Sequence, residues 1–296
     1  MRFVGLLLCA AFAFSADRKV AITIDDLPRG GDGGSISLAS VRDMTARLLK
    51  PFRDRRIPVI GFVNDGRAPE IARTIYEQWL DAGAELGNHT YSHADFTETP
   101  LAQFGAEIVK GEGVLRPLLE ARGKRIEFFR HPYLHTGKTA SDKRGLEEFL
   151  KARGYRIAPV TFDNSDYMFA AAYLKPEFKE RVDREYLPYL ESVIGWFEKR
   201  SVEVAGREFP QIMLLHANEL NSRKMAEILA MFEKRGYSFV SLDDALRDEA
   251  YRLPENYVGT GGFSWIHRWA ITKGMPMRGG EPDEPEWVRK AFQATR

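Results

Sequence analysis

Short β-rich runs alternate with helical patterns along most of this chain, and this alternation limits the possible folds more than any other feature. Seven such runs are each separated from the next by a segment whose apolar residues recur at helical spacing. Parallel strands need helical crossovers, so the pattern predicts an α/β protein with a parallel β/α barrel. The runs are Val20–Ile24, Ile57–Val63, Ala84–Gly87, Ile126–Phe129, Arg156–Phe162, Gln211–Leu215 and Ser238–Val240.

Several of the intervening helices have recognisable starts and ends. One apolar repeat follows the possible cap Ser37, and a second begins after Pro69 and ends at Gly83. Further helices are expected at about Leu101–Leu119, Leu146–Arg153, Phe178–Phe197 and Met225–Arg235, the last ended by Gly236.

The first residues have the layout of a secretory signal peptide. Arg2 precedes an apolar run over 3–14, and the small residues Ser15 and Ala16 follow it. The run is too short to span a bilayer. We therefore expect a signal peptide at 1–16, export to a periplasm or the extracellular space, and no membrane span in the mature chain. A single barrel domain is expected at 17–250, with a C-terminal extension at 251–296 packing on it.

Cysteine content and net charge limit the disulfides that the chain can form and the classes of molecule that it can bind. Cys9 is the only cysteine, so a cleaved product can form no disulfide. The formal net charge of +1 falls to about zero once Arg2 is removed, which argues against electrostatic binding of nucleic acid or other polyanions. A neutral glycan is a better-matched partner, and nothing in the sequence specifies an oligomeric state.

Polar residues follow the predicted strands at corresponding places. In a β/α barrel the carboxyl ends of the strands form one rim, where side chains from distant sequence positions converge. We therefore expect a single site built from Asp25 and Asp26 after the first strand, His89 after the third, Arg130 after the fourth, Asp163 after the fifth and His216 after the sixth.

Three of these segments supply a candidate metal site. His89 and His93 are four residues apart, which would put both rings on one side of a helical turn, and Asp26 supplies a carboxylate. Two histidines and one carboxylate leave positions open on the ion for water and substrate. Zinc is the first choice, and cobalt, nickel or manganese would also fit. Such an ion lowers the pKa of water to about 7 and polarises a substrate carbonyl.

The remaining polar residues suggest acid–base chemistry. Asp25 would take the proton of the attacking water, and Arg130 would keep that carboxylate ionised. His216 would protonate a leaving amine as general acid. An acidic neighbour would orient the His216 ring, and of Asp163 and Asp166 we favour Asp163 because it immediately follows its strand.

Substrate contacts are expected next to these groups. The backbone amide of Tyr133 would help hold an oxyanion, and Leu214 would line a small acyl pocket. His131 would touch substrate or orient a loop. In the aromatic segment 261–269, Trp265 and Trp269 are expected to pack as a C-terminal cap rather than to stack on sugars.

These segments resemble the five ordered motifs of the polysaccharide deacetylase family, also called the NodB homology domain or carbohydrate esterase family four. The resemblance runs from about Val20 to Ala245. It implies a distorted seven-stranded barrel that removes acetyl groups from glycans with the help of a metal. It also implies Asp25 as base, Arg130 as its partner, His216 as acid and Asp26, His89 and His93 as ligands. The matching segments are Thr23–Asp26, His89–His93, Arg130–Tyr133, Asp163–Tyr167 and Leu214–His216.

Two features depart from the family pattern. The fourth motif ends in Asp166-Tyr167 where the family commonly has Asp-Trp, so the resemblance implies that Tyr167 forms a different hydrophobic wall of the acyl pocket. A long helical insertion at about 168–207 precedes the sixth strand. Both features affect which substrate the site would accept more than which reaction it would catalyse.

The leading hypothesis is an exported deacetylase acting on an N-acetylated polysaccharide such as peptidoglycan or a chitin-type glycan. An amidase acting on a small amide or cyclic imide would use the same groups. A glycan-binding protein without catalysis is the non-enzymatic alternative, although the base and the acid are both present. Glycoside hydrolysis fits poorly, because adjacent Asp25 and Asp26 cannot flank a sugar from opposite sides.

Overall fold

The computed structural model describes residues 18–295. The expected signal peptide at 1–16, with Cys9, lies outside these residues. Within the described part, no helix is both long enough and apolar enough to cross a membrane.

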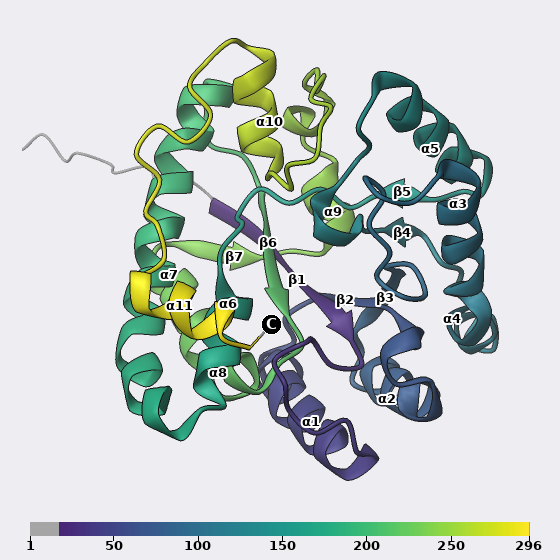
Figure 1. Cartoon of the computed structure of the whole chain (residues 1–296), viewed down its shortest axis with the longest axis vertical. Coiled ribbons are helices and arrows are strands. Elements are labelled where there is room, and N and C mark those ends of the chain that lie inside the picture. Colours follow the sequence, from purple (N-terminus) through teal and green to yellow (C-terminus); the bar gives the residue numbers. More distant parts are fainter. Residues whose placement is uncertain (1–17, 296) are drawn as a thin grey trace, which may run out of the picture.

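All seven predicted strands are present, and every pairing between them is parallel. The order across the sheet is β5-β4-β3-β2-β1-β6, and β7 pairs with the first residues of β1. The sheet curls into an open barrel with helices around it (Figure 1), which confirms the predicted fold class. The strands are β1 Arg18–Leu27, β2 Val59–Val63, β3 Glu85–Asn88, β4 Phe128–Phe129, β5 Arg156–Ile157, β6 Gln211–His216 and β7 Tyr237–Phe239.

The central strand β1 is buried on both faces. Ile22 and Ile24 belong to the large core between the sheet and the helices, whereas Ala21 packs inside the barrel against residues such as Phe62 and Ile212. In a parallel strand that is covered on both faces, a polar side chain is tolerated only if it has a hydrogen-bond or ion-pair partner. This burial matters for the acidic residues near its end.

The helices largely follow the expected pattern. Ser37 caps α1 by accepting a hydrogen bond from the Ser40 amide, and Pro69 is the first residue of α2. The bounds are α1 Leu38–Arg55, α2 Pro69–Asp81, α3 Leu101–Lys110, α4 Glu112–Glu120, α5 Ala140–Ala152, α6 Asp166–Tyr173, α7 Pro176–Ala205, α8 Glu219–Lys234, α9 Leu242–Leu246, α10 Trp265–Thr272 and α11 Glu286–Gln293, with short 3₁₀ turns η1 Asp65–Arg67, η2 Pro132–Leu134 and η3 Glu249–Arg252.

One expected helix is divided. The segment predicted as a single helix over 101–119 forms α3 and α4, which part at Gly111. A Cβ added at Gly111 would lie 3.0 Å from both Asn88 Oδ1 and the carbonyl carbon of Thr90. The glycine is therefore needed where this helical pair presses against the loop that follows β3.

The C-terminal residues pack closely on the rest of the chain. The Trp265 amide donates to the Val160 carbonyl at 2.7 Å, and the buried Trp269 ring contacts Phe209 and Tyr251. Further along, α11 packs on α6 and buries Val288. The two tryptophans thus make packing contacts of the kind expected for a cap.

We predict that Trp269→Ala destabilises the fold by about 3–5 kcal/mol, because it empties a fully buried aromatic site. Urea unfolding followed by circular dichroism would measure the loss. Val202→Ala, on the exposed side of α7, is the matched control and should change the free energy of unfolding by less than about 0.5 kcal/mol. A cost below about 1 kcal/mol for Trp269→Ala would show that the extension contributes little to stability.

Candidate metal and acid–base site

Two adjacent carboxylates lie buried near the carboxyl end of β1. The residue opposite Asp25 across the sheet is His216 on β6, and the pairing of β1 with β2 is irregular between Ile24 and Leu27. Asp26 has a φ of 67°, in the left-handed region that aspartate tolerates better than most residues. The local irregularity separates the environments of the two carboxylates.

The two histidines meet through a loop. His89 follows β3 directly, and the backbone from His89 to His93 is not helical. Thr90 and His93 have φ angles of 64° and 60°, and the Thr90 amide donates to Asn88 Oδ1 at 2.8 Å. The centroids of the His89 and His93 rings are 4.9 Å apart. The prediction of a helical turn over His89–His93 is therefore wrong, but the two imidazoles are neighbours as predicted.

Asp26, His89 and His93 offer ligand atoms that all lie within 4.8 Å of one another. Asp26 Oδ1 is 3.4 Å from His93 Nε2 and 3.7 Å from His89 Nε2. Tetrahedral ligands about 2 Å from zinc stand roughly 3.3 Å apart, so modest adjustment would close the set around an ion. His89 Nδ1 lies 2.8 Å from the Arg130 carbonyl, which fixes Nδ1 as the donor and leaves Nε2 free.

The electrostatics also suit a cation. Burial lowers the pKa of His89 well below its usual value, and burial likewise lowers the pKa of His93, so both rings are neutral ligands at pH 7. Burial would raise the pKa of Asp26, but His93 and Arg67 outweigh it and hold that pKa well below its usual range. The three groups are thus in the protonation states that zinc requires.

Asp25 lies beside this set and is only 2% exposed. Its Oδ2 is 3.4 Å from Arg130 Nη1, and Arg130 Nη2 donates to Thr23 Oγ1 at 2.9 Å. Burial raises the pKa of Asp25 to about 6 even though Arg130 lowers it. Arg130 limits the rise, so Asp25 is ionised at neutral pH and is a stronger base than an exposed carboxylate.

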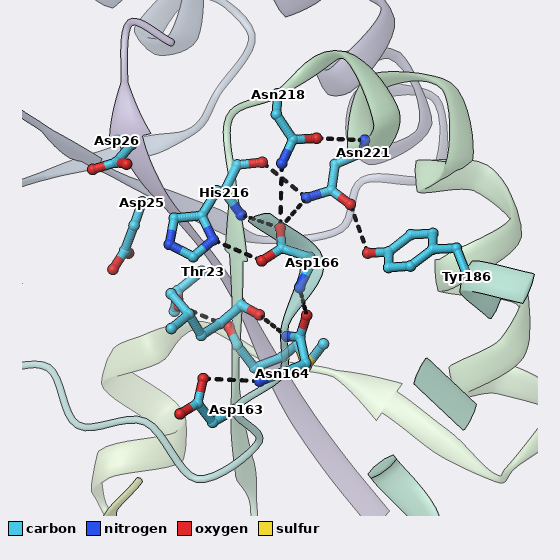
Figure 2. Close-up of polar contacts among 12 residues, drawn as sticks. Thr23, Asp25, Asp26, Asp163, Asn164, Asp166, Tyr186, His216, Asn218 and Asn221 are labelled. Atoms are coloured by element: carbon cyan, nitrogen blue, oxygen red, sulfur yellow. Dashed lines mark hydrogen bonds and ion pairs between the residues drawn. The ribbon is translucent and has the colours of Figure 1, made fainter. Parts of the chain in front are cut away.

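His216 faces the two carboxylates from β6 (Figure 2). Its Nδ1 lies 2.7 Å from Asp166 Oδ1, and its backbone amide donates to Asp166 Oδ2 at 2.9 Å. Burial lowers the pKa of His216, but attraction and hydrogen bonding to Asp166 outweigh burial and bring it to about 9. The ring is therefore a protonated acid at neutral pH.

The prediction that Asp163 orients the His216 ring is wrong, because Asp166 is the acid that contacts this ring. Asn164 turns the chain between them, because its Nδ2 donates to the Leu214 carbonyl at 2.6 Å and its Oδ1 accepts from the Asp166 amide at 2.8 Å. Because of this turn, Asp166, the first residue of α6, lies next to His216 of β6. Asp163 accepts a hydrogen bond from the Asn164 amide, and burial raises its pKa to about 6.

Aromatic and apolar side chains border these groups. Tyr133 is 50% exposed, and its ring centroid lies 4.4 Å from that of His93. The Tyr167 ring lies 5.9 Å from His216 and 5.2 Å from Phe292 of α11. Leu214 forms a small buried cluster with Leu134, Val160 and Trp265. Tyr133 and Tyr167 thus lie beside His93 and His216, whereas the roles expected for the Tyr133 amide and for Leu214 stay predictions.

His131 does not join the other site residues. Its ring is buried against Phe129, and neither ring nitrogen has a hydrogen-bond partner among the described residues. Burial, with Arg268 adding to it, lowers its pKa to about 3. It borders a cavity of about 250 Å³ that none of the other predicted site residues lines. The expected substrate contact therefore has no support in the geometry.

Sequence reasoning missed two partners of Asp26. Asn64 Nδ2 donates to Asp26 Oδ1 at 2.9 Å, and Arg67 Nη1 lies 3.2 Å from Asp26 Oδ2. Asn64 directly follows β2, so the rule that singled out the other strand ends would have found it. Arg67 lies in η1 and carries no comparable signal.

We predict that Asp166→Asn lowers the pKa of His216 far below about 9 in metal-stripped protein, whereas Asp163→Asn changes it little. The shift follows because the neutral amide removes the charge that favours the imidazolium. Histidine proton resonances followed against pH would measure it, with His216→Asn identifying the signal. Equal shifts in the two variants would contradict the assignment of Asp166.

The same shift predicts a pH-dependent stability. The pKa of His216 is higher in the folded protein than its usual value of 6.5, so its stabilisation is complete below about pH 6.5 and is lost as pH rises through about 9. Asp166→Asn should therefore lower the free energy of unfolding more at pH 6 than at pH 9.5. Urea unfolding at the two pH values would measure the difference, and an equal loss at both would refute the linkage.

Comparison with known sequences identifies relatives. A sequence model of the family described as polysaccharide deacetylase matches residues 15–149. A chitin deacetylase from Arthroderma benhamiae is 27% identical over 154 residues, which cover 51% of this chain and 36% of that relative. The matched region thus spans little more than a third of the curated relative.

Solved structures share the fold at low identity. The chitin deacetylase from Colletotrichum lindemuthianum matches 78% of this chain and 88% of its own, with a TM-score of 0.52 and 19% identity. A carbohydrate esterase family 4 pseudoenzyme from Bacillus anthracis matches 79% of this chain and 67% of its own, with a TM-score of 0.51 and 15% identity. At these identities the likeness establishes the fold alone.

Proposed function

We propose that this chain, which matches the polysaccharide deacetylase family over residues 15–149, is a metal-dependent hydrolase that removes acetyl groups from a polysaccharide. The bond cleaved is the carbon–nitrogen bond of an N-acetyl group, and the substrate is a peptidoglycan or chitin-type glycan. One observation carries the proposal: the candidate ligands Asp26, His89 and His93 lie beside a buried carboxylate, Asp25, that faces a protonated imidazole, His216.

The two titrating groups have complementary roles. Asp25, with a pKa near 6, is ionised at neutral pH and takes the proton of the attacking water. His216 is protonated at the same pH and donates its Nε2 proton to the leaving nitrogen, while Asp166 holds Nδ1. Between the two pKa values, about 6 and about 9, the carboxylate is ionised and the imidazole is protonated, and a base and an acid in these states match the demands of amide hydrolysis.

Other residues bind and orient. Asp26, His89 and His93 would hold the divalent ion, with zinc preferred and cobalt, nickel or manganese as alternatives. When bound, the ion supplies Lewis-acid polarisation of the carbonyl and acidifies water. The Tyr133 amide is assigned to the oxyanion, and the ring of Tyr167 with Leu214 to the walls of the acyl pocket.

The glycan assignment is supported by the curated relative, which is named a chitin deacetylase. The exposed Tyr133 ring beside His93 offers a face on which a sugar can pack. Export through the N-terminal segment, and a glycan outside the cytoplasm as partner, belong to the same proposal. An amidase for small amides is the second candidate, because nothing in the acid–base pair itself selects a sugar.

We predict zinc-dependent acetate release from N-acetylglucosamine oligomers. Metal-stripped protein should be inactive, reloading with zinc or cobalt should restore turnover, and Asp25→Asn should lower kcat by at least about 100-fold because the base is lost. Enzymatic detection of acetate measures the rate. Asp163→Asn, at a buried acid outside the assigned steps, should keep at least about a third of the wild-type rate.

The result that would overturn the proposal is equally direct. If reloaded wild-type protein releases no acetate from chitin, peptidoglycan or acetylated xylan fragments but cleaves small amides, the amidase becomes the function. Saccharide binding without any release would favour the non-catalytic alternative.

We also predict that Asp26→Ala abolishes zinc binding, because the two histidines alone cannot close the set. Isothermal titration with zinc measures the affinity independently of activity. Asp95→Ala, which removes an acid near His135 but outside the triad, should bind zinc as the wild type does. Wild-type affinity in Asp26→Ala would place the metal elsewhere.

A further inference from the structure

We propose that Tyr186, acting through Asn221, is a positioning residue for the acid His216. The proposal rests on the proposed function of His216 and extends it to the inserted segment before β6, since Tyr186 lies on α7. It assigns that long helix a role in the reaction. Figure 2 shows the chain of contacts from Tyr186 through Asn221 and Asp166 to His216.

The Asn221 side-chain amide is held on both sides, and Tyr186 holds its oxygen. Both protons of the Asn221 amide are used, since Nδ2 lies 2.5 Å from Asp166 Oδ2 and 2.9 Å from the His216 carbonyl. The Tyr186 hydroxyl donates to Asn221 Oδ1 at 2.8 Å. A flipped amide would turn its oxygen toward two acceptors and its NH₂ toward a hydroxyl proton. The two acceptors therefore fix which way the amide faces, and the Tyr186 hydroxyl holds the amide oxygen in place from the other side.

That orientation decides how Asp166 meets His216. Asp166 Oδ2 accepts from Asn221, from the His216 amide and from Asn218 Nδ2 at 3.3 Å. Oδ1 is then left to His216 Nδ1, at 2.7 Å. These three donors hold Oδ2 in place, which keeps Oδ1 aimed at the ring. Losing the Asn221 donor would let the carboxylate rotate and lengthen the contact with Nδ1.

The network is closed to solvent, which strengthens each contact. Tyr186, Asn221 and Asp166 are all completely buried. In such surroundings a misdirected amide or carboxylate cannot be compensated by water, so it costs more than at the surface. The Tyr186 ring also packs against Phe169, with centroids 5.4 Å apart, so its hydroxyl has little freedom to follow a displaced partner.

Tyr186→Phe tests the proposal, because it removes the hydroxyl and keeps the buried ring. Zinc-loaded protein is used throughout. We expect kcat for acetate release to fall by about tenfold with KM changed by less than about twofold, since substrate contacts are untouched. The downfield proton resonance of His216 Nδ1, assigned with His216→Asn, should move upfield or broaden. Asn221→Asp, which faces Asp166 with an acceptor, should lower kcat further.

The matched control is Tyr251→Phe. The Tyr251 hydroxyl donates to the Pro210 carbonyl at 2.6 Å, beside the amino end of β6, at the opposite end of the strand from His216. This variant loses a comparable hydrogen bond and should keep the kcat and the Nδ1 resonance of the wild type. Thermal unfolding of both variants measures the loss of stability that each hydroxyl deletion causes.

Two outcomes would overturn the positioning role. One is a Tyr186→Phe protein with wild-type kcat and an unchanged Nδ1 resonance. The other is an equal loss of kcat in Tyr186→Phe and Tyr251→Phe, which would mark a general effect of stability. If wild-type protein releases no acetate from any glycan, the proposed function fails, and the Nδ1 resonance alone then decides whether Tyr186 positions His216.

Discussion

Burial of two adjacent carboxylates near the end of β1 is the constraint on which the rest of the site depends. A buried charge is costly unless partners compensate it. Asp25 obtains Arg130 from the end of β4, whereas Asp26 obtains Asn64 and Arg67 from the segment after β2 and the two histidines that follow β3. Since these partners come from the ends of three strands, β2, β3 and β4, these strands must be assembled beside β1 for the two buried carboxylates to be compensated.

Nearby positive charges compensate the burial of Asp26 more fully than that of Asp25, and this difference gives the two residues different roles. Burial dominates at Asp25 and raises its pKa, whereas nearby positive charge dominates at Asp26 and lowers its pKa. One carboxylate is thus poised to accept a proton, and the other stays ionised as a ligand. Adjacent residues with one chemistry acquire two functions from their surroundings alone.

The acid His216 depends on residues from three helices that follow β5 and β6. Asp166 opens α6, Asn221 lies in the first turns of α8, and Tyr186 comes from the middle of α7. The Tyr167 ring that borders His216 is itself packed by Phe292 near the C-terminus. The inserted helix and the terminal helix therefore support the same half of the site.

The sequence by itself determined the seven strands, their parallel arrangement and most of the polar residues at the strand ends. It could do so because side-chain periodicity reports burial locally, and because parallel strands place their carboxyl ends on one rim. Only the tertiary structure decided which acid meets His216. Asp163 and Asp166 are three residues apart, and the choice depends on the turn that Asn164 makes against Leu214, a contact 50 residues away. Likewise, the conformation of His89–His93 and the opposing pKa shifts of Asp25 and Asp26 arise from contacts between distant segments, which no local pattern in the sequence encodes.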